Sequence, residues 1–326
     1  MAGDRILLRQ EKKKIDPVNI SAAPPKILLS GASGMLGTAL RHALAQRGDR
    51  VLQLVRRDPA APGEIKWDPS ASKPLVDLQP LEGLTAAVHL SGASVAGRRW
   101  TANYKREMAV SRVDSTRALA SVLSILHQPP SAFVAASAAG FYGNRGDELL
   151  DERSSPGNGF LADLCRDWEA AAQPAVAAGI CVVHPRFGVV LGAQGGALAK
   201  MLLPFKLGLG GRLGSGRQWM SWISLADTVA ALLFLIDTPE LSGPFNLTAP
   251  EPVTNSEFTR ALARAVHRPA VLPVPAFVLR VVFGAMAEEA LLSSARVLPA
   301  KLTAAAFSFA HPTVDQALAA ALHSPR

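Results

Sequence analysis

The sequence predicts an α/β protein with a doubly wound parallel sheet and a second, smaller mixed lobe towards its C-terminal end. Three observations lead to this prediction. Short apolar runs alternate with helical apolar spacing from residue 26 onward, a glycine-rich turn joins the first run to the first helix, and the pattern changes after about residue 190. With 326 residues, of which 49% are hydrophobic and 18% charged, the chain can bury a large core without a metal or disulfide.

The first unit is a strand, a helix and a strand. Lys26–Ser30 has the pattern of a buried strand, Met35–Arg47 has helical apolar spacing, and Arg50–Val55 has the pattern of a second strand. Because parallel strands need such a crossover, this unit predicts a parallel pair. The alternation continues through four further strands, Glu64–Trp67, Ala86–Leu90, Ala132–Ala136 and Cys181–His184, and two long helices, Asn103–Leu126 and Phe160–Ala178.

The second half of the chain predicts a mixed lobe. It contains four helical segments and one short strand: Lys200–Leu209, Leu225–Ile236, Asn255–Val266, Ala276–Leu292 and Phe245–Leu247. Thr254 precedes Glu257 by three residues, which is typical of a helix N-cap. We therefore expect a flexible tail over residues 1–25, a cofactor domain of the Rossmann type over 26–185, and a substrate lobe over 186–326.

Charge and cysteine content narrow the class of protein. The net charge of +8 is spread along the chain without a dense basic stripe, which argues against nucleic acid and suits an anionic cofactor or substrate. Cys165 and Cys181 are the two cysteines, and no Cys-x-x-Cys spacing occurs, so we expect no metal site and a reduced, cytoplasmic setting. The apolar stretch Val271–Val282 contains two prolines and falls short of the roughly 20 residues of a membrane span, so we expect no membrane partner.

The strongest motif is the turn between the first strand and the first helix, Ser30-Gly31-Ala32-Ser33-Gly34-Met35-Leu36-Gly37. Gly31 permits a tight turn, Gly34 lets backbone approach a diphosphate, and Gly37 lets the helix pack on its strand. The N–H groups at the start of the helix favour an anion. Together these features predict a dinucleotide site.

Two further strand ends contribute to that site. The second strand ends in Val55-Arg56-Arg57, where a basic residue accommodates the 2′-phosphate of NADP and an acidic one would bind the hydroxyl of NAD. Arg56 is the first choice and Arg57 the second. The fourth strand ends in Leu90-Ser91-Gly92, whose small residues let a cofactor cross the sheet edge. His89, within that strand, is interpreted as a core histidine.

Longer strings resemble a known family. SGASGMLG, LVRR, HLSGAS, SAAGFYG and PRFGVVLG stand in the order of the extended short-chain dehydrogenases/reductases. WTANYKREMAVSR, FLADLCRDWEAAA, MLLPFKLGLGGRLGSGRQWMSWISLAD and the stretch beginning at Pro273 resemble an atypical branch, the YfcH-type epimerase family. The resemblance covers about residues 26–322 and implies a family-specific C-terminal domain over about 273–322.

The family resemblance also implies site residues. NADP(H) would lie at the glycine turn, at Val55-Arg56 and at Leu90-Ser91. Glu107 and Arg112, on the helix after the fourth strand, would reach the cofactor, and Val190 would contribute backbone near the nicotinamide. Extended members commonly dimerise through the two long helices, so we expect a homodimer.

The chain departs from the family's catalytic pattern. Ordinary members use a Tyr-x-x-x-Lys pair with a Ser or Thr, in which the Lys lowers the pKa of the Tyr that exchanges a proton with substrate. Here the corresponding segment, 159–165, reads GFLADLC and contains neither Tyr nor Lys. Ser137 and Tyr142 are the nearest hydroxyl candidates, and Tyr142 is also a candidate for the pocket wall.

The substrate side is predicted from Arg212, Arg217, Gln218, Trp219 and Trp222, because guanidinium groups bind anions and indoles offer stacking faces. Two functions remain open. One is an NADP-dependent oxidoreductase or epimerase-like enzyme acting on a small, anionic or nucleotide-sugar-like substrate. The other is an NADP(H)-binding sensor or regulatory protein with little catalysis.

Overall fold

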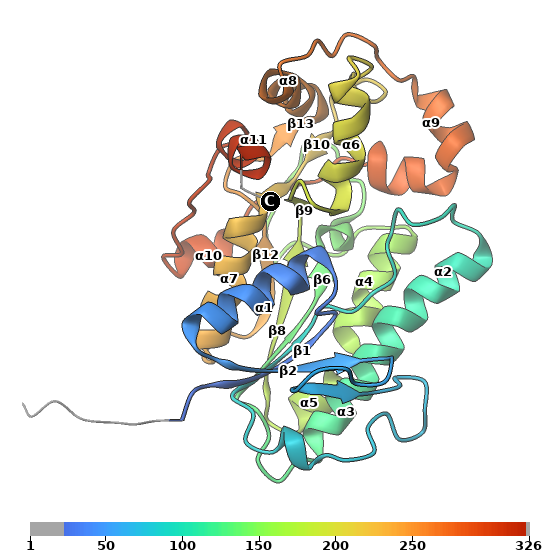
Figure 1. Cartoon of the computed structure of the whole chain (residues 1–326). Helices are drawn as coiled ribbons and strands as arrows, with labels where there is room; N and C mark the ends of the chain where they lie inside the picture. Colours follow the sequence, from blue (N-terminus) through green and yellow to red (C-terminus); the bar gives the residue numbers. More distant parts are fainter. Residues whose placement is uncertain (1–22, 324–326) are drawn as a thin grey trace, which may run out of the picture.

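The computed structural model describes residues 23–323 and has a central parallel sheet covered by helices on both faces (Figure 1). The strand order is β3-β2-β1-β4-β5-β8-β12, with the short β6 also paired to β8, and every pair is parallel. The strands are β1 (Lys26–Ser30), β2 (Arg50–Val55), β3 (Glu64–Lys66), β4 (Ala86–His89), β5 (Ala132–Ala135), β6 (Ser137–Ala138), β8 (Cys181–Phe187) and β12 (Gly243–Leu247). The predicted doubly wound α/β fold is confirmed.

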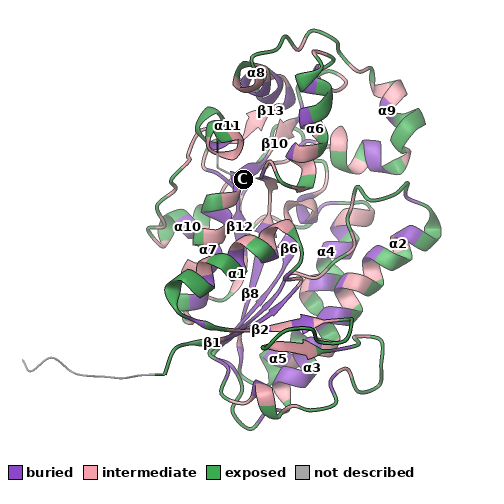
Figure 2. Ribbon diagram, in the orientation of Figure 1, coloured by how far each residue is buried: buried purple, intermediate pink, exposed green. Residues whose placement is uncertain are grey.

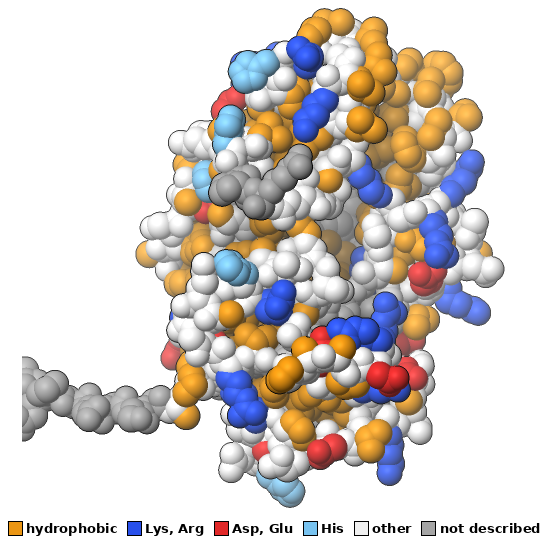
Figure 3. All heavy atoms as spheres, viewed as in Figure 1, with side chains coloured by type: hydrophobic (Ala, Val, Ile, Leu, Met, Phe, Trp, Pro, Cys, Tyr) orange, Lys and Arg blue, Asp and Glu red, His pale blue; other side chains and the backbone are white. Residues whose placement is uncertain are grey.

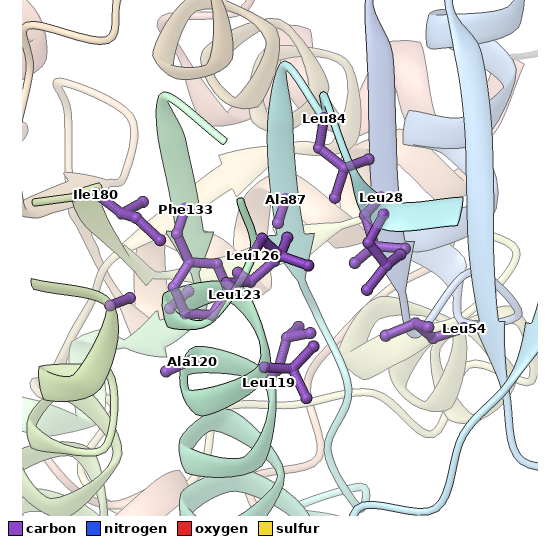
Figure 4. Close-up of a cluster of buried hydrophobic side chains, with 14 of the residues drawn as sticks. Leu28, Leu54, Leu84, Ala87, Leu119, Ala120, Leu123, Leu126, Phe133 and Ile180 are labelled. Atoms are coloured by element: carbon purple, nitrogen blue, oxygen red, sulfur yellow. The ribbon is translucent and has the colours of Figure 1, made fainter. Parts of the chain in front are cut away.

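Alternating side chains of the strands form two cores. Leu28 of β1 faces a cluster with Phe133 and with Leu119 and Leu123 of α3 (Ser115–Ser124), shown in Figure 4. The neighbouring residue of β1, Leu29, faces the opposite cluster, which contains residues of α1 (Met35–Arg47) and α7 (Leu225–Asp237). Figure 2 shows the strands as the buried centre of the molecule. This alternation is expected of a strand covered on both faces.

Three predicted helices differ from single α-helices. The predicted Asn103–Leu126 helix is α2 (Ala102–Ala109), a π-helical turn and α3, in one continuous helical run. The predicted Phe160–Ala178 helix divides into α4 (Phe160–Ala170) and α5 (Gln173–Ala177), where Pro174 occupies the first turn of α5. The predicted Ala276–Leu292 helix breaks at Gly284, where φ is +60°, into α9 (Ala276–Phe283) and a π-helical segment over Ala287–Leu291.

The second half of the chain contributes to the sheet as well as to a separate lobe. The predicted domain division at residue 185 lies inside β8, and the later strand β12 pairs with β8. The lobe contains α6 (Gly196–Lys206), α8 (Asn255–Val266), α10 (Ala300–Ala304), α11 (Val314–His323) and three two-stranded sheets. These sheets are β9 (Val189–Leu191) with β11 (Trp222–Ser224), β10 (Trp219–Met220) with β13 (Val253–Thr254), and β7 (Leu149–Leu150) with β14 (Arg296–Val297).

Local signals placed several ends correctly. Thr254 caps α8 in a complete capping box with Glu257, as the spacing predicts.

The predicted tail over residues 1–25 lies almost entirely outside the described residues. None of the helices within residues 23–323 combines the length and apolar character needed to cross a bilayer. In the same part of the chain, no group of three or more His, Cys, Asp and Glu side chains could hold a metal ion.

Candidate functional site

The glycine turn brings β1, α1 and β4 into close contact. Gly31 has φ +74°, and a Cβ there would lie 2.7 Å from the backbone carbon of Leu90. A Cβ on Gly37 would lie 2.1 Å from the carbonyl oxygen of Gly31. Both positions therefore exclude any larger residue. Gly34, the N-cap of α1, is different: a Cβ there would meet only the Gly31 oxygen, at 3.5 Å.

The start of α1 is open for an anion. Ser33 and Gly34 are exposed, and no side chain caps the helix. Helix N-termini with free N–H groups bind phosphates, and the carboxyl edge of a doubly wound sheet is the place where such folds bind nucleotides. Met35 and Leu36 are partly buried, Met35 lining a cleft and Leu36 packing against the core. The turn fits a dinucleotide diphosphate.

His89 holds the strands beneath this turn. The Ser115 hydroxyl donates to the Ser111 carbonyl at 2.7 Å, so the ring hydrogen of His89 is assigned to Nε2, which donates to Ser115 Oγ at 3.0 Å. His89 Nδ1 then accepts from Ser30 Oγ at 2.5 Å, and Ser91 Oγ donates to Ser30 Oγ at 3.1 Å. Burial lowers the pKa of His89 to about 3. It is a neutral core histidine, as predicted.

The two arginines after β2 have different environments. Arg57 forms a two-pronged ion pair with Glu64, at 2.5 and 2.8 Å, and this guanidinium, with backbone N–H groups, lowers the pKa of Glu64 to about 2. Arg56 is exposed and has no hydrogen bond or ion pair with the rest of residues 23–323. The structure thus favours Arg56 over Arg57 as the group free to bind a phosphate.

Arg112 and Glu107 do not line the cleft. Arg112 is buried and donates to the carbonyl of Ala93 at 2.8 Å and to that of Met108 at 3.3 Å. Its guanidinium lies against Gly92, where a Cβ would be 3.1 Å from Cζ, so it supports the loop that follows β4. Glu107 is half exposed, and its carboxylate is 3.7 Å from Arg98.

A cleft of about 710 Å³ extends from the glycine turn between the sheet and the lobe. Its walls come from the start of α1, the ends of β8 and β9, the first turn of α4, α6, β10 and the segment after α9. Val190 lines it, as predicted. The position of this cleft at the carboxyl edge of the sheet is where a substrate would meet a bound dinucleotide.

The predicted substrate residues divide into three groups. Gln218 and Trp219 line the cleft: the Gln218 amide donates to the carbonyls of Leu213 and Leu291, both at 3.1 Å, and Trp219 Nε1 donates to Asp147 at 2.8 Å. Arg212 and Arg217 are exposed and outside its lining.

The prediction that Trp222 contacts substrate is wrong. It is fully buried, its indole donates to the Glu251 carbonyl at 3.0 Å, and it belongs to the core of the lobe. The reason is that β11 is an interior strand whose side chains pack against helices.

The two predicted hydroxyl candidates are also outside the cleft. Ser137 is 1% exposed and donates to Glu169 at 2.6 Å. Tyr142 is fully buried, donates to Asn246 Oδ1 at 2.7 Å and accepts from Arg186 Nη1 at 3.0 Å. Burial raises the pKa of Tyr142 to about 12. Both residues belong to a closed network around the Arg186–Glu169 ion pair, which joins β8 to α4.

The first turns of α4 carry no proton relay. Leu161 lines the cleft, and Cys165, four residues later, is buried, which raises the pKa of its thiol to about 12. The carboxylate of Glu289, from the C-terminal region, accepts from the Leu161 N–H at 2.8 Å and lines the cleft. Sequence analysis missed Glu289, Lys200 and Asn158 as lining residues, because only the packing of the lobe brings them there.

A glycine turn of this geometry, in a sheet of this order, defines a dinucleotide-binding Rossmann protein. The chain belongs to the NAD dependent epimerase/dehydratase family, whose model matches residues 27–248, and residues 274–321 match a domain of unknown function, DUF1731. Within that family it is an epimerase family protein of the SDR39U1/YfcH type, with the NAD(P)-binding fold of the short-chain dehydrogenases/reductases.

Similar proteins cover nearly all of this chain. The chain is 45% identical over 299 residues to epimerase family protein MT2273 of Mycobacterium tuberculosis, covering 92% of this chain and 98% of the relative. A crystal structure of human SDR39U1 with NADPH is 34% identical with TM-score 0.84, covering 91% of this chain and 99% of that one. A crystal structure of a nucleoside-diphosphate sugar epimerase from Corynebacterium glutamicum is 35% identical with TM-score 0.76, and the match covers 92% of this chain and 58% of that one.

Proposed function

We propose that this protein is an NADP(H)-dependent oxidoreductase or epimerase-like enzyme that acts on a small organic substrate without a Tyr–Lys relay. The observation that carries the proposal is the free guanidinium of Arg56, one strand away from the open start of α1. The crystal structure of human SDR39U1 with NADPH supports the same cofactor.

The residues present fit such a cofactor. The backbone from Gly31 to Gly37 would bind the diphosphate, and Arg56 would bind the 2′-phosphate. The loop Leu90–Gly92, which Arg112 supports, would let the cofactor cross the sheet edge. When bound, a reduced nicotinamide supplies a hydride. The chain's own part is to place that ring beside the cleft, where Met35 and Val190 line the wall nearest the glycine turn.

A second function, an NADP(H) sensor or regulatory binding protein, is favoured by one observation. Neither Ser137 nor Tyr142 opens into the cleft, and Leu161 presents an apolar side chain there. A sensor would bind the cofactor and change its conformation or partners without turnover. Product formation from any carbonyl compound, measured by mass spectrometry, would exclude this alternative.

The test of the cofactor assignment compares two adjacent arginines. Arg56→Ala removes charge-assisted hydrogen bonds worth about 1.5–3 kcal/mol, so NADPH affinity should fall by about 10- to 100-fold while NADH affinity changes little. Arg57→Ala is the matched control, because its guanidinium is already paired with Glu64. Isothermal titration calorimetry measures both. Equal NADPH affinity in wild type and Arg56→Ala would refute the assignment.

We also propose that the protein acts in the cytoplasm and forms a homodimer. Both described cysteines, Cys165 and Cys181, are free thiols, which suits a reducing compartment. The proposed dimer would use the exposed faces of α2–α3 and α4. A mass of one chain by light scattering would refute the dimer, and cell fractionation tests the compartment.

A further inference from the structure

The walls of the cleft are mainly apolar and contain no guanidinium. Among the described residues that line it, only Lys200, Glu288 and Glu289 carry charge. Four of the six methionines of the chain, Met35, Met201, Met220 and Met286, line it. Methionine is flexible and polarisable and adapts to flat apolar ligands. The lining therefore matches an uncharged organic ring better than a phosphorylated one.

The three charged groups of the lining already have protein partners. Lys200 Nζ donates to the Ala96 carbonyl across the cleft, and Glu288 pairs with Arg280. Glu289 accepts from the Leu161 N–H at 2.8 Å. A diphosphate in this cleft would meet two carboxylates and a single ammonium group. Since nucleotide sugars require cations for their diphosphate, the lining disfavours them.

One wall is suited to stack against a ring. Trp219 lines the cleft, and its indole is fixed by the hydrogen bond to Asp147 and by Arg296, whose Cζ lies 4.2 Å from the ring centroid. An indole held in this way offers a flat, rigid surface. Asn158, which also lines the cleft, is exposed, and its side chain has no partner among residues 23–323. Its amide can donate to one oxygen of a ligand.

The missing proton relay restricts the chemistry. Reduction of a simple ketone leaves an alkoxide, which is so strong a base that its conjugate acid is about as weak as water, so an acid must be at hand. A conjugated acceptor instead leaves a delocalised oxyanion, whose conjugate acid resembles a phenol with a pKa of about 10. Such a product can be formed without a tuned tyrosine, and it can be protonated by water.

We propose that the cleft takes uncharged, flat, conjugated carbonyl compounds of the quinone or enone class. The proposal rests on the proposed NADP(H)-dependent function. The acceptor gains one hydride, with its two electrons, that the reduced nicotinamide loses, and its oxygen takes one proton from water. Trp219 stacks on the ring, the methionines enclose it, and Asn158 donates to the oxygen.

The experiment separates binding of the cofactor from binding of the acceptor. Calorimetry first measures NADPH binding to the full chain. The NADP⁺-loaded protein is then titrated with menadione and, separately, with UDP-glucose, and NADPH consumption is followed with each compound. We expect saturable menadione binding and stoichiometric hydroquinone formation, and at least tenfold weaker binding of UDP-glucose.

Paired variants localise the acceptor. Leu161→Gln places a polar group on the cleft wall and should weaken menadione binding by about five- to tenfold, with NADPH affinity retained. Leu203→Gln is the matched control, because Leu203 is 66% exposed on α6 and lies outside the lining. Equal effects of both variants would overturn the placement of the acceptor in the cleft.

The remaining outcomes are distinct. If NADPH binds but UDP-glucose binds more tightly than menadione, or if neither binds, the substrate class is wrong and the cofactor assignment stands. If NADPH does not bind to folded protein, the proposed function fails, whatever menadione does.

Discussion

Replacing Tyr142 by phenylalanine should lower stability and leave chemistry unchanged. The variant removes one hydroxyl that donates to Asn246 at 2.7 Å and accepts from Arg186 at 3.0 Å, inside a fully buried network. Each buried partner left short of a hydrogen bond costs about 1–3 kcal/mol. Arg186 keeps two bonds to Glu169, and Asn246 keeps its bond to the Leu298 carbonyl. We therefore expect a loss of about 2–4 kcal/mol.

Calorimetry and kinetics check this expectation. At roughly 2 °C per kcal/mol for a chain of this length, Tm should fall by about 4–8 °C. NADPH affinity and turnover, measured well below Tm, should stay within about twofold of wild type, because the phenol has no access to the cleft. Ser137→Ala is the companion variant and should behave in the same way. A loss of turnover beyond tenfold at unchanged Tm would show that Tyr142 acts in catalysis and refute the reasoning.

Three further predictions concern the fold around the site. Gly37→Ala should abolish NADPH binding and lower Tm, because the new Cβ would lie 2.1 Å from the Gly31 oxygen. Gly34→Ala should fold normally, because a Cβ there would lie 3.5 Å from that oxygen. Equal Tm values for the two variants, measured by calorimetry, would contradict this prediction. Burial holds the pKa of His89 at about 3, so below pH 6.5 the unfolded chain binds a proton that the folded chain does not. The stability that neutral His89 contributes is therefore present above pH 6.5 and falls towards pH 3, with a loss of about 3 kcal/mol at pH 4.5. Urea melts of His89→Asn should show a smaller pH dependence than those of wild type. Asp227→Ala should lower the free energy of unfolding by about 2–5 kcal/mol, since the carboxylate accepts from the Ala310 N–H at 2.7 Å and from the His311 N–H at 3.0 Å. Limited proteolysis of the variant should cut first near residue 310. An unchanged digestion pattern would count against this role of Asp227.

Prediction from sequence succeeded where the signal is local. The strand Lys26–Ser30, the helix Met35–Arg47 and the helix Asn255–Val266 match their predicted bounds. Each has its own apolar period and its own boundary residues, such as Gly34 before α1 and Thr254 before α8. The alternation of strands with helices also predicted the parallel, doubly wound sheet, because parallel strands need crossover connections.

Prediction was weaker where burial depends on distant segments. Tryptophans near arginines suggest a binding loop, yet Trp222 is in the core and Trp219 lines the cleft, although only two residues separate them. Ser137 and Tyr142 are the nearest hydroxyl groups in the sequence. Their burial depends on Arg186, Glu169 and Asn246, whose distances along the chain gave no signal of contact.

The sequence alone determined the sheet, the glycine turn and the absence of a Tyr-x-x-x-Lys pair, because these depend on residue type and spacing over short stretches. Only the tertiary structure decided which arginine after β2 is free, which aromatic rings face the cleft, and that the cleft contains methionines rather than arginines. These properties depend on contacts that form only on folding. Arg57 meets Glu64 when β2 pairs with β3, and Leu161 meets Glu289, 128 residues away, when the lobe packs on the sheet. Local propensity does not encode such contacts.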